Sequence, residues 1–220
     1  MMCKPGSYHV KKHFRLSTNG KRHVVEEHCR VNRKHKLNTL FASNIEYLFI
    51  NRKKNYLKLK KIKGQKDFGK YDVIVQFWLD YWHDQKEINF QIDPMIVKAI
   101  ITVESSFREK VVTKIPGSST TGLMQITKRT MEWLSGKPKK DGFIQVSKNQ
   151  VDINQKDAQS ANSNIAAGTR WLIFKINTSP DRNSKSKVKK LHSGIKYYYG
   201  WNEDGQKYLE KVLKVYNANK

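Results

Sequence analysis

From Tyr71 to the end of the chain, apolar side chains recur at the three- and four-residue spacing of an α-helix face. The clearest segment covers 71–84 and carries Val73, Ile74, Phe77, Trp78, Tyr81 and Trp82. A second helix is expected from Asp93-Pro94, because Asp caps helix N-termini and Pro is tolerated at the first helical position. Further helices are expected over about 128–134, 161–176 and 191–217, with a Pro-, Gly-, Ser- and Thr-rich loop at 113–121. The pattern predicts a mainly α fold for residues 71–220.

The N-terminal third has a different pattern. Asn19-Gly20 is a strong signal for a tight turn, and it predicts a β-hairpin with arms over 8–16 and 21–31. We expect a basic β-hairpin module over residues 1–36, a basic helical linker over 37–70 and the helical domain over 71–220. No internal repeat is expected. No apolar run is long enough for a transmembrane segment.

The charge of the chain is strongly positive. Lys and Arg number 43 against 19 Asp and Glu, a formal net charge of +24, and residues 1–70 alone hold 19 basic and 4 acidic residues. Such a field favours an anionic partner: nucleic acid, teichoic acid, an acidic lipid surface or an acidic protein. Charge alone would make nucleic acid the default interpretation.

The chain holds two cysteines, Cys3 and Cys29, and with so few we expect no disulfide framework. Histidines lie near both, but their spacing matches no zinc finger, so neither a metal nor another cofactor is expected. We expect the basic hairpin to bind an anionic wall polymer, nucleic acid or a delivery partner. No apolar stretch follows the first lysine, so no secretory signal peptide is expected.

Glu104 is the first candidate for chemistry. It ends a helix whose other residues are nearly all apolar. The negative end of the helix dipole and apolar surroundings both disfavour a carboxylate, so we expect a raised pKa. A glutamate that keeps its proton near neutral pH can serve as a general acid. The alternative from this position alone is a glutamate that faces water at a helix end.

Several separated segments carry a family resemblance. Glu104–Phe107 reads Glu-Ser-Ser-Phe, Gly122–Ile126 reads Gly-Leu-Met-Gln-Ile, and Asn164–Gly168 reads Asn-Ile-Ala-Ala-Gly. Tyr197–Gly200 reads Tyr-Tyr-Tyr-Gly, and Tyr208–Val212 follows as Tyr-Leu-Glu-Lys-Val. In this order the segments resemble the motifs of the soluble lytic transglycosylases, which are lysozyme-like enzymes that cleave the glycan of peptidoglycan.

The resemblance implies a mechanism and a set of site residues. Glu104 would be the sole general acid and base: it would protonate the oxygen between N-acetylmuramic acid and N-acetylglucosamine. It would then take the proton of the muramic C6 hydroxyl, giving a 1,6-anhydro product without water. Met124 and Gln125 would line the glycan cleft. Ser105 is a further candidate for substrate binding, and Thr113 would replace a loop serine that hydrogen-bonds the glutamate.

The resemblance also implies a tyrosine hydroxyl on Glu104, from the segment that ends at Gly200. Counting back from this glycine selects Tyr197, with Tyr198 as the alternate, because Tyr198 stands where the family has asparagine. The chain departs from the family in two further respects: the loop after Glu104 is longer, and Trp171 replaces the usual tyrosine.

Two other functions stay open. A goose-lysozyme-like muramidase, which hydrolyses the same bond, would need a second carboxylate facing Glu104. We expect the candidates Glu132, Asp152 and Asp157 to be ordinary surface acids. The other alternative is a protein that binds nucleic acid or another anionic polymer through an inert lysozyme-like domain.

The expected partner is the glycan strand of peptidoglycan, with nucleic acid not the main partner. A wall enzyme made in the cytoplasm without a signal peptide would reach the periplasm or cell wall by another export route or by lysis. We favour an exported antibacterial effector over a phage-type enzyme or a conjugation component. Such an effector implies an export-machine carrier and an acidic immunity protein to match the charge of +24.

Overall fold

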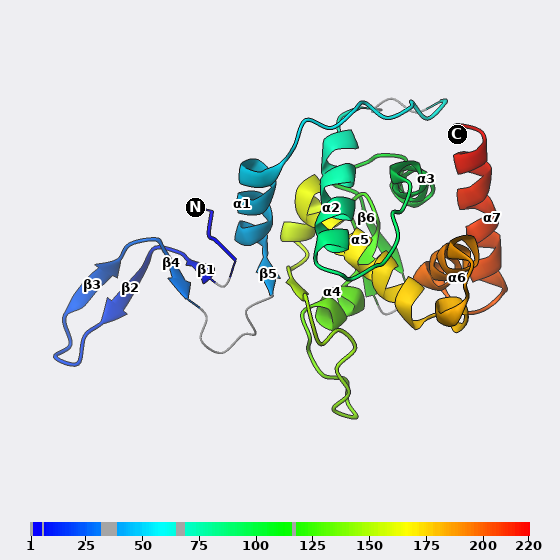
Figure 1. Cartoon of the computed structure of the whole chain (residues 1–220). Helices are drawn as coiled ribbons and strands as arrows, with labels where there is room; N and C mark the ends of the chain where they lie inside the picture. The colour runs from blue at the N-terminus through cyan, green and yellow to red at the C-terminus, as the bar shows by residue number, and fades with distance from the viewer. Residues whose placement is uncertain (1, 6, 32–38, 65–68, 116–117) are drawn as a thin grey trace.

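The computed structural model describes residues 2–5, 7–31, 39–64, 69–115 and 118–220. The described chain is mainly α-helical, as the sequence predicted (Figure 1). Its helices are α1 (Ala42–Arg52), α2 (Asp72–Asp84), α3 (Pro94–Ser105), α4 (Lys128–Leu134), α5 (Ala161–Thr178), α6 (Lys187–Tyr199) and α7 (Glu203–Asn217), with 3-10 turns η1 (Asp157–Gln159) and η2 (Pro180–Asn183).

The predicted helices α2 to α5 are confirmed, and local signals explain where they begin. Asp93 caps α3, accepting a hydrogen bond at 2.9 Å from the backbone N–H of Met95. The region expected as one helical stretch over 191–217 is two helices, separated at Gly200. The start of α7 packs closely against the end of α6. A Cβ atom on Gly205 would lie 2.3 Å from the carbonyl oxygen of Gly200, so there is no space for a side chain at Gly205.

Helix α5 crosses the centre of the helical body and is buried along most of its length (Figure 1). Two tryptophans of α2 pack on it and satisfy their polar ends there. The indole N–H of Trp78 donates to Asn162 at 2.7 Å, and that of Trp82 donates to Thr169 at 3.1 Å. A buried tryptophan needs such a partner, so these bonds fix the rotation of α2 against α5.

The region expected as a helical linker is part of the same body. Ile45 and Leu48 of α1 are buried in one cluster with the cores of α2, α3 and α5. Residues 53–64 contain no helix, but they are tied down at Asp72, whose carboxylate accepts from the backbone N–H of Leu59 at 2.9 Å. The expected boundary at 36/37 lies outside the described residues.

The hairpin predicted at the N-terminus is present as a long ribbon with a bend in it. Strand β1 (Ser7–Val10) pairs with β4 (His28–Val31), and β2 (His13–Leu16) pairs with β3 (Arg22–Val25), both antiparallel. Gly20 supplies the positive φ of the turn, at 75°. The ribbon projects away from the helical body (Figure 1).

The bend is formed by two copies of a short sequence pattern, one in each arm of the ribbon. Val10–Arg15 reads Val-Lys-Lys-His-Phe-Arg, and Val25–Arg30 reads Val-Glu-Glu-His-Cys-Arg. In each copy the histidine Nδ1 lies 2.8 Å from the carbonyl oxygen two residues earlier. The lysine pair of one copy faces the glutamate pair of the other, with Lys12 and Glu26 in an ion pair at 2.9 Å. Each copy therefore forms the same bend between two strands.

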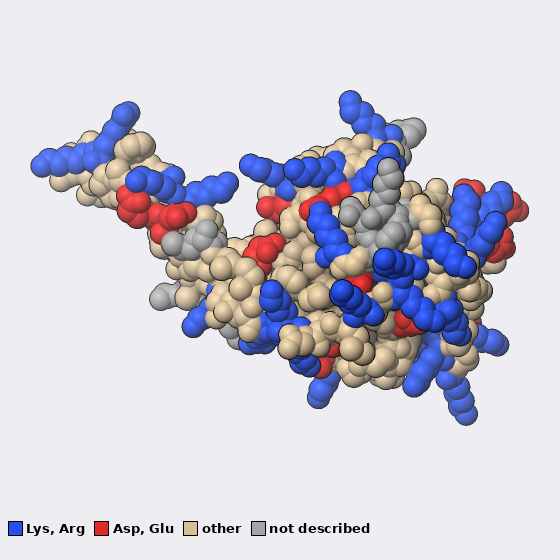
Figure 2. All heavy atoms as spheres, turned by 90° about the horizontal axis from the view of Figure 1, so that it is seen from above, with Lys and Arg blue, Asp and Glu red and all other residues tan. Residues whose placement is uncertain are grey.

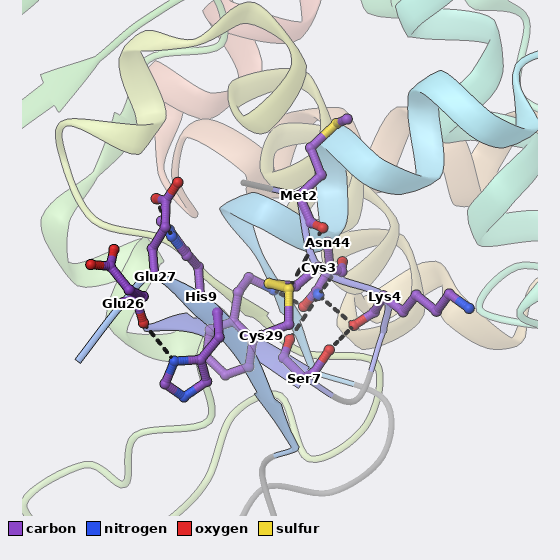
Figure 3. Close-up of a disulfide and its surroundings, with 11 residues drawn as sticks. Met2, Cys3, Lys4, Ser7, His9, Glu26, Glu27, Cys29 and Asn44 are labelled. Atoms are coloured by element: carbon purple, nitrogen blue, oxygen red, sulfur yellow. Dashed lines mark hydrogen bonds and ion pairs between the residues drawn. A yellow bond between two sulfur atoms is a disulfide. The ribbon is translucent and has the colours of Figure 1, made fainter. Parts of the chain in front are cut away.

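The base of the ribbon carries a disulfide between Cys3 and Cys29, which corrects the expectation drawn from the cysteine count (Figure 3). One pair of cysteines is enough to cross-link the ribbon, because the bond joins the N-terminal segment to β4. Both thiols are used in this bond, so neither is free to bind a metal. The side-chain amide of Asn44 on α1 donates at 2.8 Å to the carbonyl oxygens of Cys3 and Ser7. The ribbon is thereby attached to the helical body at its base.

None of the helices in the described part of the chain combines the length and apolar character that a bilayer crossing needs. Lys and Arg side chains are spread over the face seen in Figure 2 and also lie on the ribbon.

Candidate active site

Glu104 lies in the last turn of α3, half-buried. The hydroxyl of Tyr208 on α7 donates to its Oε1 at 2.7 Å. Burial raises the pKa of Glu104 to about 7, although the hydrogen bond from Tyr208 acts in the opposite direction. The direction agrees with the expectation from sequence. At neutral pH a large share of Glu104 therefore carries a proton that it can donate.

A cavity of about 490 Å³ opens over Glu104. It is lined by Glu104, Thr113, Thr120, Gln125, Ile126, Thr127, Thr130, Trp171, Tyr198 and Tyr199. Among these described lining residues, Glu104 carries the one carboxyl group. Glu132, Asp152 and Asp157 do not line it.

The Glu-Ser-x-Phe segment shapes the end of α3. The Ser105 hydroxyl is buried and lies 2.8 Å from the carbonyl oxygen of Leu123 and 3.1 Å from that of Ile101. Phe107 is buried and stacks on Tyr71, with ring centroids 6.0 Å apart. Ser105, predicted to bind substrate, thus lies outside the cavity lining and joins α3 to the next motif.

The Gly-Leu-Met-Gln-Ile segment turns sharply beside the cavity. Gly122 has φ of 79°, and a Cβ atom there would lie 2.3 Å from Nδ2 of Asn164. Both the positive φ and the lack of space for a side chain therefore require glycine at this position. Asn164 on α5 binds this turn through both ends of its amide. It accepts from the backbone N–H of Met124 at 2.7 Å and donates to the carbonyl oxygen of Thr121 at 2.9 Å.

Of the two residues expected to line the glycan cleft from this segment, only Gln125 does. Its side chain donates to the carbonyl oxygen of Gly122 at 2.8 Å and accepts from the Thr120 hydroxyl. The Met124 side chain is fully buried instead and packs on Gly168 of α5, where a Cβ atom would lie 2.3 Å from its Sδ. Met124 is therefore a core residue, and its close packing explains the glycine at 168.

The expected loop at 113–121 is largely a β-hairpin, apart from residues 116–117, which lie outside the described residues. Strands β6 (Val112–Ile115) and β7 (Ser118–Thr121) pair antiparallel, and β8 (Ile126–Thr127) adds a third strand. Thr113 and Thr120 are direct cross-strand partners, and both line the cavity. The structure thus brings Thr113 to the cavity of Glu104, whereas the hydrogen bond found on the glutamate comes from Tyr208. Two short strands, β5 (Leu40–Phe41) and β9 (Val151–Asp152), pair in parallel elsewhere.

The tyrosine on Glu104 is Tyr208, so the selection of Tyr197 is corrected. Tyr197 points elsewhere and packs on Trp201, with ring centroids 5.6 Å apart. Tyr198, the alternate, lines the cavity, but its hydroxyl donates to the carbonyl oxygen of Met124 at 2.8 Å. Tyr208 is the first residue of Tyr208–Val212, the last segment of the family resemblance. That segment was the sequence signal from which this tyrosine could have been identified.

Two comparisons with known proteins bear on this site. The family model described as the transglycosylase SLT domain matches residues 81–219, a range that holds Glu104 and every motif around the cavity. The ribbon and α1 lie outside that range. No curated protein matches the chain.

Proposed function

The chain belongs to the transglycosylase SLT family, whose activity is lytic-transglycosylase-type cleavage of peptidoglycan, and on this premise we propose Glu104 as its single general acid and base. The observation that carries the proposal is a half-buried glutamate over a sugar-sized cavity, with a pKa raised to about 7. Such a group is protonated often enough at neutral pH to donate to a glycosidic oxygen.

In the first step, protonated Glu104 gives its proton to the oxygen between N-acetylmuramic acid and N-acetylglucosamine. As that bond breaks, positive charge develops on the muramic acid, and Glu104 becomes a carboxylate. The Tyr208 hydroxyl, 2.7 Å away, then donates to a full negative charge. This hydrogen bond therefore becomes stronger as the glycosidic bond breaks.

In the second step, the Glu104 carboxylate takes the proton from the C6 hydroxyl of the same muramic acid. The C6 oxygen closes on C1 and gives the 1,6-anhydro product, while Glu104 returns to its protonated form. The single carboxyl group among the described lining residues favours this route over a muramidase, which usually places a second carboxylate across the bond.

The other polar lining residues bind the sugars in this proposal. Gln125 and Thr120 hold each other on one wall. The Gln125 amide N–H groups donate to the carbonyl oxygens of Gly122 and Val111, so its Oε1 keeps a lone pair that accepts from substrate hydroxyl and amide groups. Thr113 stands beside Thr120 on the hairpin. Tyr199, which is exposed, adds a flat apolar surface on which a sugar ring can pack, whereas Trp171 is buried and its ring stacks on Trp133 and Phe174.

The experiment is digestion of purified sacculi, with the released muropeptides identified by mass spectrometry. We expect products one water lighter than the hydrolytic muropeptides, and we expect Glu104→Gln to release none. Products of full hydrolytic mass would instead select the muramidase. Equal release by the wild type and Glu104→Gln would refute the role of Glu104.

We further propose that the chain acts in the periplasm or cell wall, where its substrate lies. The Cys3–Cys29 disulfide supports this location, because such bonds persist in oxidising compartments. We also propose delivery as an antibacterial effector. Its partner would be an immunity protein, and we expect that protein to be acidic because the chain carries a net charge of +24. Thiol alkylation of the protein recovered from each compartment tests the location: free thiols in the periplasmic fraction would contradict it.

A further inference from the structure

A second hollow, of about 950 Å³, adjoins the cavity of Glu104. It is lined by Lys128, Arg129, Glu132, Trp133, Lys137, Pro138, Lys139, Lys140 and Asp141. Helix α4 contributes to both spaces: Thr130 lines the cavity of Glu104, while Arg129 and Trp133 line the second hollow. The two spaces are therefore lined by neighbouring residues of one short helix.

A pair of stacked tryptophans forms the wall between the two spaces. Trp171 lines the cavity of Glu104, and its ring stacks on that of Trp133 with centroids 5.6 Å apart and an interplanar angle of 29°. Trp133 in turn lines the second hollow. Trp171 is also a position at which the chain departs from the family motif.

Three cationic side chains lie over these two rings. The Arg129 guanidinium is 4.8 Å from the centre of the Trp133 ring, and the Lys139 ammonium is 5.4 Å from it. The Lys175 ammonium is 4.4 Å from the centre of the Trp171 ring. Contact with the ring faces holds these cations in place without neutralising them. Arg129 and Lys139 line the second hollow, whereas Lys175 lines a separate cavity beside Phe174.

The charge of this region is unbalanced. None of these three cations takes part in an ion pair within the part of the chain that the structure describes. The hollow itself is lined by five lysine or arginine residues against two acids. Lys175 is half-buried, and its pKa is lowered by that burial and by the positive charge of Lys139. An anion bound here would relieve this repulsion.

We propose that Arg129 and Lys139, which lie over the Trp133 ring in the second hollow, form a subsite for carboxylate groups of the peptidoglycan substrate, with Lys175 adding to the local positive charge. This rests on the proposed function, because that function brings the glycan to the adjoining cavity. Muramic acid carries its carboxylates on the peptide stem or, once the stem is removed, on the lactyl group. The guanidinium of Arg129 suits such groups, because its planar fork can bind both oxygens of a carboxylate. We assign the peptide stem as the ligand.

The test measures binding in a Glu104→Gln background, so that the result does not depend on cleavage. The probe is soluble glycan in three forms: with stems, with stems removed by an amidase, and with stems removed and the remaining lactyl carboxylates blocked as amides. Calorimetry gives Kd for the parent and for the variant Arg129→Gln/Lys139→Gln. We expect about a tenfold rise in Kd for the stem-bearing form, the size of one lost charge-assisted hydrogen bond.

Two control variants accompany this pair. Lys58→Gln/Lys61→Gln removes the same charge from exposed positions on the segment that crosses the top of Figure 1, opposite α4. It should leave Kd unchanged, which separates a local subsite from a general charge effect. Arg129→Lys/Lys139→Arg retains both charges and should restore most of the binding.

The three substrate forms separate the sources of the carboxylate. A loss confined to stem-bearing strands supports the stem as ligand, and a loss that persists on amidase-treated strands supports a carboxylate subsite but assigns it to the lactyl group. An equal loss on strands with blocked carboxylates, an unchanged Kd, or no binding by the parent would overturn the proposal. Failure of the proposed function would show separately, as a wild-type protein that binds sacculi but releases no products.

Discussion

Replacing Tyr208 by phenylalanine tests the acid role of Glu104 most directly. The substitution removes one hydroxyl, which donates to the glutamate Oε1 at 2.7 Å, and keeps the ring that stacks on Tyr199 with centroids 4.9 Å apart. The hydroxyl stabilises the carboxylate and so lowers the pKa of Glu104 against the larger effect of burial. Without it, the pKa of Glu104 rises further above about 7.

The size of the effect follows from the kind of bond. A hydrogen bond to a charged group contributes about 1.5–3 kcal/mol, and a change of one pH unit corresponds to about 1.4 kcal/mol. Because Glu104 must be protonated to donate, kcat/KM falls as pH rises through its pKa. The alkaline limb of the wild-type profile should therefore centre near pH 7, the pKa of Glu104, and move up by about one to two pH units in Tyr208→Phe.

The assay is release of muropeptides from sacculi over pH 5 to about 10, with kcat/KM taken at each pH. Tyr198→Phe is the matched control, because it removes a buried hydroxyl that donates to the carbonyl oxygen of Met124 and not to Glu104. It should change the rate without moving the limb. A limb that stays in place in Tyr208→Phe, or moves to lower pH, would refute this account of the acid.

Three further predictions concern stability and the ribbon. The folded pKa of Glu104, about 7, lies above its ordinary value of 4.5, so the wild type loses stability as pH rises from about 4.5 to about 7, and the loss is complete above that pH. Glu104→Gln should therefore raise the free energy of unfolding by about 3 kcal/mol at pH 8 and change it little at pH 4, measured by urea denaturation; equal effects at both pH values would argue against the raised pKa. Asn164→Ala leaves three buried backbone groups without their partner and should cost about 3 kcal/mol in the same measurement, together with most of the activity. Reduction of the Cys3–Cys29 bond should speed amide exchange in β1 and β4, by removing about 3 kcal/mol of loop-closure constraint, while exchange in α5 stays as it was; unchanged protection of the ribbon would contradict its anchoring role.

The helices were predictable because their signals are local. Apolar spacing places one face of α2 in the core, and the Asp93-Pro94 pair begins α3 within a few residues of its cap. The division between α6 and α7 was not predictable in this way. Three tyrosines continue the helical pattern up to Gly200, and only the close packing of Gly205 against that residue shows where the chain turns.

The hairpin under the cavity escaped prediction for a similar reason. Residues 113–121 are rich in threonine and serine, which suit loops as well as strands, and the pairing of Thr113 with Thr120 depends on the third strand beside them. The disulfide also needed the fold. Cys3 and Cys29 are 26 positions apart, and the ribbon that brings them together begins only after the first of them.

The sequence by itself determined that the chain is mainly helical, that it resembles a family of glycan-cleaving enzymes and that Glu104 is its candidate acid, because each helix and each motif is a run of neighbouring residues that can be recognised without the fold. Only the tertiary structure decided which tyrosine reaches that acid, that Met124 and Ser105 are buried, and that Arg129 and Lys139 lie over the Trp133 ring in the second hollow. Tyr208 and Glu104 lie 104 positions apart, and their contact depends on how α3 and α7 pack. Packing of that kind is set by the whole core and leaves no local signal.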